Sequence, residues 1–312
     1  MTEPIAYLKG KIVPYSEAKV PVADLGLVLG TSVTEMIRTF RHQPFHLDRH
    51  LERMMRSLTG IGIPLPVTKH ELVEIIGQIV SHNAGLIPPK HDLGIVIFVS
   101  PGENLTYHGL AKAEYCKQPT LGVHTFALPF EMWAEKFTTG QHLITPSVRH
   151  IPAVSVDPKL KQRSRLHWYL ADQQARLGDP KASALVLDQQ GNVTETSTAN
   201  FFLVSQGTVY APRPDHILGG VSQMIVVELL EKLGIPYRTG DMQTYDVFNA
   251  DEAFTSSTPY CLLPVTKFNG RPLGDGKVGP IYERLIAAWS EKVGFDIVEQ
   301  MQTGAKERFP KH

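Results

Sequence analysis

The spacing of apolar residues along the chain predicts a mixture of strands and helices. Residues 32–40 (SVTEMIRTF) place β-branched and apolar side chains in near alternation, as a strand does. In residues 51–58 the apolar side chains recur at the spacing of one helix face, and Asp48 is a candidate cap for the start of that helix. Residues 94–100 (GIVIFVS) form a continuous β-branched run, which is typical of a buried strand.

Glycine-containing turns predict two hairpins, one around Lys9-Gly10 and one around Gln206-Gly207, because glycine readily adopts the positive φ that a tight turn needs. The same periodicities predict further strands over 121–128, 182–187 and 252–257, and helices over 69–84, 163–177, 222–233 and 281–293. No internal repeat, low-complexity tract or charge run interrupts this order. The pattern indicates an α+β fold and not a regular alternation of strand and helix.

The length of 312 residues favours two domains over a single hydrophobic core. Residues 129–140 have no clear period and are the best linker candidate. We therefore expect a small N-terminal α/β domain over 1–128, a linker over 129–139 and a larger C-terminal domain over 140–312.

Composition narrows the class of protein. Lysine plus arginine equals aspartate plus glutamate, 31 against 31, so we expect neither a nucleic-acid nor a membrane partner. Only two cysteines are present, and no histidine and cysteine spacing indicates a metal site. The N-terminus lacks the pattern of a signal peptide, and no apolar run is long enough to span a membrane. These features predict a cytoplasmic protein.

Lys161 is the first candidate for chemistry. It lies in KLKQRSRL, a cation-rich stretch that is typical of a solvated helix start. Neighbouring cations lower the pKa of a lysine, as a lysine that forms a Schiff base requires. Composition alone leaves both interpretations open.

The chain resembles the class IV aminotransferases, a family that includes branched-chain and D-amino-acid aminotransferases and aminodeoxychorismate lyase. The resemblance covers nearly the whole chain in the right order. It rests on ADLGLVLGTSVTEMIRTF, FHLDRHLERMMRSL, LKQRSRLHWYLADQQAR, ALVLDQQGNVTETSTANFFLV, ILGGVSQMIVVELLEKLGI and DEAFTSSTPYCLLPV. Glu195 follows Lys161 by 34 positions, which is close to the spacing in the family.

The resemblance implies a two-domain fold type IV enzyme, similar to D-amino-acid aminotransferase, that binds pyridoxal 5'-phosphate (PLP) between its domains and forms a homodimer. Lys161 would be the catalytic lysine that forms the Schiff base with PLP and then moves a proton on the substrate. Glu195 would face the pyridine nitrogen and keep it protonated. The implied cofactor ligands are Arg53, Lys161, Glu195, Asn200, Gly220, Val221, Ser222, Ser257 and Thr258.

The substrate-binding residues depart from the well-known subgroups. Branched-chain enzymes place an arginine near Gly94, and D-amino-acid enzymes place one at Thr106, so neither arginine that holds the substrate carboxylate is present. The candidates that remain for substrate contacts are Thr34, Arg38, Tyr107, His108 and Arg149. Either another cation binds the carboxylate, or the substrate is an amine without one.

The leading prediction is transfer of an amino group between an amino acid or amine and a 2-oxo acid. Two alternatives stay open at this point. One is a PLP lyase of the aminodeoxychorismate lyase type, which would release pyruvate without an acceptor. The other is a PLP-binding protein without catalysis, which the presence of both Lys161 and Glu195 disfavours.

Overall fold

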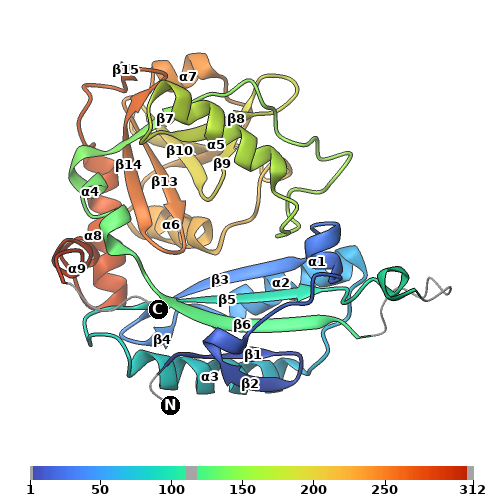
Figure 1. Cartoon of the computed structure of the whole chain (residues 1–312). Coiled ribbons are helices and arrows are strands. Elements are labelled where there is room, and N and C mark those ends of the chain that lie inside the picture. The colour runs from blue at the N-terminus through green and yellow to red at the C-terminus, as the bar shows by residue number, and fades with distance from the viewer. Residues whose placement is uncertain (1–2, 110–117, 308–312) are drawn as a thin grey trace. The chain divides into compact units, whose positions relative to one another are not determined.

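The computed structural model describes residues 3–109 and 118–307, which form two compact units (Figure 1). Unit 1 consists of the described residues up to Leu128 together with Leu160–Arg165. Unit 2 consists of Pro129–Lys159 and Leu166–Glu307. Residues 160–165, which the sequence placed in the C-terminal domain, lie in unit 1 because their backbone pairs with a strand of that unit.

Unit 1 is built on an antiparallel sheet with the strand order β2-β1-β6-β5-β3-β4. Its strands are β1 (Ile5–Leu8), β2 (Lys11–Pro14), β3 (Val33–Phe40), β4 (Gln43–Pro44), β5 (Leu93–Ser100) and β6 (Thr120–Ala127). Its helices are η1 (Tyr15–Glu17), α1 (Leu25–Val28), α2 (Leu47–Ile61), α3 (Lys69–Ala84) and η2 (Leu105–His108). Helix α2 packs against β3, and α3 packs against β1, β5 and β6 (Figure 1).

The core of unit 1 lies between one face of the sheet and helices α2 and α3. Odd-numbered residues of β3 and β5, such as Val33 and Ile97, are fully buried there against Leu51 and Ile76 of the helices. The alternation predicted for residues 32–40 is therefore confirmed, because a period of two places one set of side chains on the helix-covered face.

Two local predictions for unit 1, a hairpin turn and a helix cap, had different outcomes. The hairpin around Lys9-Gly10 is confirmed, with positive φ at both turn residues (49° and 86°). The prediction that Asp48 caps α2 was wrong. His46, in the left-handed region, is the N-cap, and Asp48 lies within the first turn.

Unit 2 contains a mixed sheet with the order β12-β11-β10-β13-β14-β7-β8-β9, in which β9 also pairs with β10. Its strands are β7 (Gln141–Ile144), β8 (Ser183–Leu187), β9 (Val193–Thr196), β10 (Asn200–Ser205), β11 (Thr208–Ala211), β12 (Tyr237–Thr239), β13 (Glu252–Ser257), β14 (Cys261–Phe268) and β15 (Arg271–Pro272). The extra pairing closes the strand path on itself through a single contact, between Glu195 and Asn200.

Helices surround the sheet of unit 2. They are η3 (Phe130–Met132), α4 (Lys136–Thr139), α5 (Leu166–Gly178), α6 (Val221–Lys232), α7 (Thr244–Phe248), α8 (Pro280–Val293) and α9 (Ile297–Gly304). The helix predicted from residue 163 begins only at Leu166, because the backbone N–H of Arg163 donates to the Ser32 carbonyl and extends the sheet of unit 1. Among the described residues, no helix has the length and apolar character needed to cross a membrane.

Candidate active site

Glu195 and Asn200 of unit 2 are direct partners in the pairing of β9 with β10. The Asn200 side-chain amide donates to Glu195 Oε2 at 3.1 Å and to the Leu218 carbonyl at 2.8 Å. The backbone N–H of Leu218 lies 3.3 Å from each oxygen of the Glu195 carboxylate. Neutral donors therefore fix a buried carboxylate in one orientation. An anion held in this way keeps its charge available for a cationic ligand.

A glycine turn leads from Leu218 into helix α6. A Cβ at Gly220 would lie 2.1 Å from Oδ1 of Asn200, so only glycine allows this approach. Gly220 is the N-cap of α6, and the buried residues Val221 and Ser222 form its first turn. The N–H groups of a first helical turn have no acceptor within the helix, and the helix dipole favours an anion there. The turn has the chemistry of a phosphate site.

Hydroxyl groups lie at the end of β13, the strand next to β10. Ser257 donates its hydroxyl to the Thr198 carbonyl at 2.7 Å, and Thr258 follows in the turn and is partly buried. Ser256 is the direct partner of Asn200 across the two strands. Its hydroxyl is buried and has no hydrogen-bond partner among the described residues. The sequence analysis named Ser257 and Thr258 but missed Ser256.

His150 is a second residue of this site that the sequence analysis missed. Its Nε2 lies 3.8 Å from Glu195 Oε1, and its Nδ1 donates to the Ile151 carbonyl at 2.8 Å. Burial lowers the pKa of His150, so at neutral pH the ring is uncharged and carries its proton on Nδ1. His150 reaches Glu195 because its backbone N–H pairs with the Leu187 carbonyl at the edge of β8. No local sequence motif signals this long-range pairing.

A buried cluster in unit 1 joins β3 to α2. Arg53 binds Glu35 through two parallel hydrogen bonds, from Nε to Oε1 at 2.8 Å and from Nη2 to Oε2 at 2.7 Å. His50 Nδ1 donates to Glu35 Oε2 at 2.8 Å. Burial acts to raise the pKa of Glu35, but Arg53 and His50 outweigh burial and lower this pKa to about 2. Arg53 was predicted to bind phosphate. Any such contact uses donors other than the two that hold Glu35.

Lys161 lies on the edge of β3 in unit 1. Its carbonyl accepts the backbone N–H of Thr34 at 2.9 Å, and its own backbone N–H donates to the Ser57 hydroxyl at 3.2 Å. The positive charge of Lys161 adds to burial in lowering the pKa of His50. Lys161 therefore lies within electrostatic reach of the cluster that contains Arg53.

The candidate substrate residues of β3 are engaged in internal contacts. Thr34 is buried and donates its hydroxyl to the Ile97 carbonyl at 3.0 Å. Arg38 is 1% exposed, lies 3.6 Å from the Asp92 carboxylate and stacks over the Phe40 ring at 3.9 Å. The charge of Arg38 is therefore matched by a buried anion of the same unit.

The other three substrate candidates lie on surfaces of the described chain. Tyr107 is 65% exposed, and Nε2 of His108 lies 3.1 Å from Glu103, which also binds Lys9. Arg149 is exposed in unit 2 and pairs along its backbone with Leu187. The three side chains are exposed and therefore available for contacts with a ligand.

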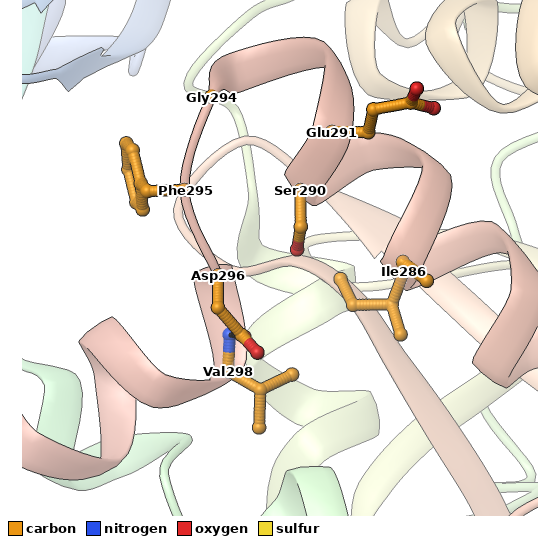
Figure 2. Close-up of a pocket in the computed structure, with 8 residues that line it drawn as sticks. Ile286, Ser290, Glu291, Gly294, Phe295, Asp296 and Val298 are labelled. Carbon is orange, nitrogen blue, oxygen red and sulfur yellow. Dashed lines mark hydrogen bonds between the residues drawn. The ribbon is translucent and has the colours of Figure 1, made fainter.

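A surface hollow of about 550 Å³ lies in unit 2 where α8 meets α9. Figure 2 shows Ile286 and Ser290 on α8 facing Asp296 and Val298 at the start of α9. Its lining includes two carboxylates but no cation that could bind a phosphate. None of the candidate cofactor ligands lines the hollow.

The described residues contain no cluster of histidine, cysteine, aspartate or glutamate that could hold a metal ion.

Comparisons with known proteins find similar sequences and folds. The Amino-transferase class IV family matches residues 32–268. A putative branched-chain-amino-acid aminotransferase from Methanocaldococcus jannaschii is 30% identical over 280 residues, which is 89% of this chain and 93% of that protein. D-alanine aminotransferase from Staphylococcus aureus strain N315 is 30% identical over 283 residues, 89% of this chain and 94% of that protein.

The fold is similar to a solved structure of the T.th. branched-chain amino acid aminotransferase with pyridoxamine 5'-phosphate. The TM-score is 0.82 at 27% identity, and the match covers 97% of this chain and 95% of that chain. The residues of this chain fit such a cofactor. A carboxylate held by neutral donors suits a protonated pyridine nitrogen, and the first turn of α6 suits a phosphate.

Proposed function

The chain belongs to the class IV aminotransferase family, and we propose the residues through which it acts. It is a PLP-dependent enzyme that transfers amino groups between amino acids and 2-oxo acids. PLP, when bound, supplies the electron sink for the carbanion that forms on the substrate. In our proposal Lys161 would hold the cofactor through its side-chain amine and would move the substrate proton as base and acid.

The observation that carries this proposal is the setting of Glu195. The side-chain amide of Asn200 and the backbone N–H of Leu218 fix the orientation of its carboxylate. His150, 3.8 Å away, is uncharged at neutral pH because burial lowers its pKa. Glu195 can therefore hold the proton on the pyridine nitrogen of the cofactor.

The proposed phosphate ligands are backbone N–H groups, hydroxyls and a guanidinium. In unit 2 they are the first turn of α6, with Gly220, Val221 and Ser222, together with Thr258 and with Ser257, whose hydroxyl must turn from the Thr198 carbonyl to donate to a phosphate. Unit 1 contributes Arg53, whose orientation Glu35 fixes through two hydrogen bonds. Backbone N–H groups and a guanidinium are suitable donors to a phosphate dianion.

For the substrate we propose a specificity other than efficient transfer from branched-chain L-amino acids. The relatives named above act on branched-chain amino acids or D-alanine, but this chain lacks both of the arginines described for those subgroups, at Gly94 and Thr106. A side chain at Gly94 would also begin 2.4 Å from the Phe126 ring, so an arginine does not fit there.

The active form is proposed to be a homodimer.

Reduction with borohydride and peptide mapping test the assignment of the lysine. Lys161→Ala is expected to abolish turnover and to leave PLP bound only non-covalently. Lys159→Ala is the matched control, because Lys159 is exposed and pairs with Asp157 at 3.3 Å. Label on Lys159 in the wild-type protein would overturn the assignment.

A comparison of three amino donors tests the substrate class. We expect kcat/KM for L-leucine with 2-oxoglutarate to lie below that of D-alanine or of 1-phenylethylamine. A value for L-leucine above about 10⁴ M⁻¹s⁻¹ would be ordinary for an enzyme and would refute the proposed specificity. Repeated turnover of aminodeoxychorismate to pyruvate, without any 2-oxo acid acceptor, would instead indicate a lyase.

A further inference from the structure

Arg163 projects from the same side of unit 1 as Lys161. Residues 161–163 pair with the edge of β3 through one bridge, in which Thr34 N–H donates to the Lys161 carbonyl and Arg163 N–H donates to the Ser32 carbonyl, both at 2.9 Å. Gln162 is the direct partner of Val33. Successive side chains of an extended segment point to opposite faces, so Lys161 and Arg163 both lie on the face opposite Val33.

This face of the sheet, here called the Met36 face, is the one that α2 and α3 do not cover. Its members are Thr34, Met36 and Arg38 of β3, Val96 and Phe98 of β5, and His124 and Phe126 of β6. The ring of Phe98 lies so close to Gly122 that a Cβ there would be 2.2 Å away. The face is mostly apolar, and its own cation, Arg38, lies 3.6 Å from the Asp92 carboxylate.

The guanidinium of Arg163 reaches over the Met36 face. Burial lowers the pKa of His124, and the positive charge of Arg163 lowers it further, which places that charge near a residue of β6. Although the Arg163 side chain as a whole is exposed, partial burial lowers the pKa of its guanidinium. None of the described residues offers the guanidinium a carboxylate or another hydrogen-bond acceptor, and His124 Nδ1 is buried without a partner in the same set.

The buried arginines Arg38 and Arg53 of unit 1 already have internal anions. Arg38 pairs with Asp92, and Arg53 binds Glu35 through two hydrogen bonds. Taking either of them for a substrate would leave a buried carboxylate without its cation, which is costly. Arg163 has no carboxylate partner among the described residues, so it can bind an external anion without breaking an internal ion pair.

The chemistry of the substrate sets where a carboxylate-binding cation must lie. An α-amino acid carries its carboxylate on the carbon atom whose proton Lys161 moves. The cation must therefore lie within one side-chain length of Lys161. Two positions along an extended segment separate the Cα atoms by about 7 Å, which meets this requirement.

We propose that Arg163 binds the α-carboxylate of the amino-acid substrate, in place of the arginines absent at positions 94 and 106. This inference rests on the proposed role of Lys161. The planar guanidinium pairs with a carboxylate through two parallel hydrogen bonds. The amino acid is thereby preferred over an amine that lacks the carboxylate.

The test compares pairs of substrates that differ only in the carboxylate, namely alanine with ethylamine and leucine with isoamylamine, with both enantiomers of each amino acid. Arg163→Gln is expected to lower kcat/KM for the preferred amino acid by roughly 100-fold and to leave the matching amine within about threefold. Arg163→Lys should restore part of the loss. Lys159→Gln, which removes a charge two residues before Lys161, should change neither rate.

A binding measurement separates this inference from the proposed function. The dissociation constant of 4-methylvalerate, a carboxylate without an amine, is measured on the PLP-loaded protein by calorimetry. It should rise by at least about tenfold in Arg163→Gln. Equal losses for amino acid and amine, or unchanged binding of 4-methylvalerate, would overturn the role of Arg163. Wild-type protein that transfers no amino group from any donor would instead overturn the proposed function, while the binding result still tests Arg163.

Discussion

Two buried glutamates, one in each unit, differ in the groups that hydrogen-bond to them. Glu35 in unit 1 is bound by the charged fork of Arg53 and by His50, so its anion is neutralised within the protein. Glu195 in unit 2 accepts hydrogen bonds from the side-chain amide of Asn200 and from the backbone N–H of Leu218, which fix the orientation of its carboxylate. The two parallel hydrogen bonds from Arg53 make Glu35 part of the structure that joins β3 to α2. The orientation of Glu195 suits its proposed role beside the pyridine nitrogen of the cofactor.

The largest effect is expected from removing the charge of Glu195. Glu195→Gln should fold and bind PLP, but kcat should fall by about 1,000-fold, equivalent to about 4 kcal/mol in the barrier, because a neutral amide cannot hold the ring proton. Steady-state kinetics at matched cofactor occupancy measure the change.

Glu252→Gln is the matched control, since Glu252 is also a buried glutamate of unit 2. Its carboxylate accepts the backbone N–H groups of Ile281 and Tyr282 at 3.1 Å, at the start of α8. Its kcat should stay near the wild-type value. A Glu195→Gln enzyme within threefold of wild type would remove the distinction between the two settings.

Glu35→Gln should cost stability. The pKa of Glu35 is lowered from its ordinary 4.5 to about 2 in the folded protein. A lowered carboxyl pKa contributes stability that is fully present above pH 4.5 and is lost as the pH falls toward 2. This difference corresponds to about 3 kcal/mol of unfolding free energy at neutral pH.

Urea unfolding from pH 7 to pH 2 measures this contribution. The wild-type protein should lose it between about pH 5 and pH 2, whereas Glu35→Gln should lack it throughout. Glu74→Gln, which changes an exposed carboxylate of α3, should behave like the wild type. If the variant and wild type show parallel pH profiles, Glu35 is not the stabilising carboxylate.

A smaller effect is expected at Arg53, which binds Glu35 and is also a proposed ligand of the cofactor phosphate. Arg53→Ala should raise the dissociation constant of PLP by roughly 10- to 150-fold, the equivalent of 1.5–3 kcal/mol for a charge-assisted hydrogen bond. Arg53→Lys keeps a cation for Glu35 and so separates phosphate binding from folding. Unchanged cofactor affinity in a folded Arg53→Ala protein would place Arg53 outside the phosphate site.

Much of the secondary structure of this protein could be predicted from local sequence patterns. The strand over 33–40, the hairpins around Gly10 and Gly207 and the helix over 69–84 form where the sequence predicts them, because period and turn chemistry are local properties. The family resemblance identified the enzyme class, and it predicts the roles of Lys161 and Glu195.

Tertiary structure alone decided the surroundings of these residues. The charge-rich stretch around Lys161 reads as a helix start, yet Gln162 pairs with Val33, and this pairing directs Arg163 to the same face as Lys161. Likewise, the pairing that closes the strands of unit 2 brings Glu195 next to Asn200, and a distant loop brings His150 beside them. Hydrogen bonds between segments far apart in the chain create these contacts, so no local periodicity encodes them.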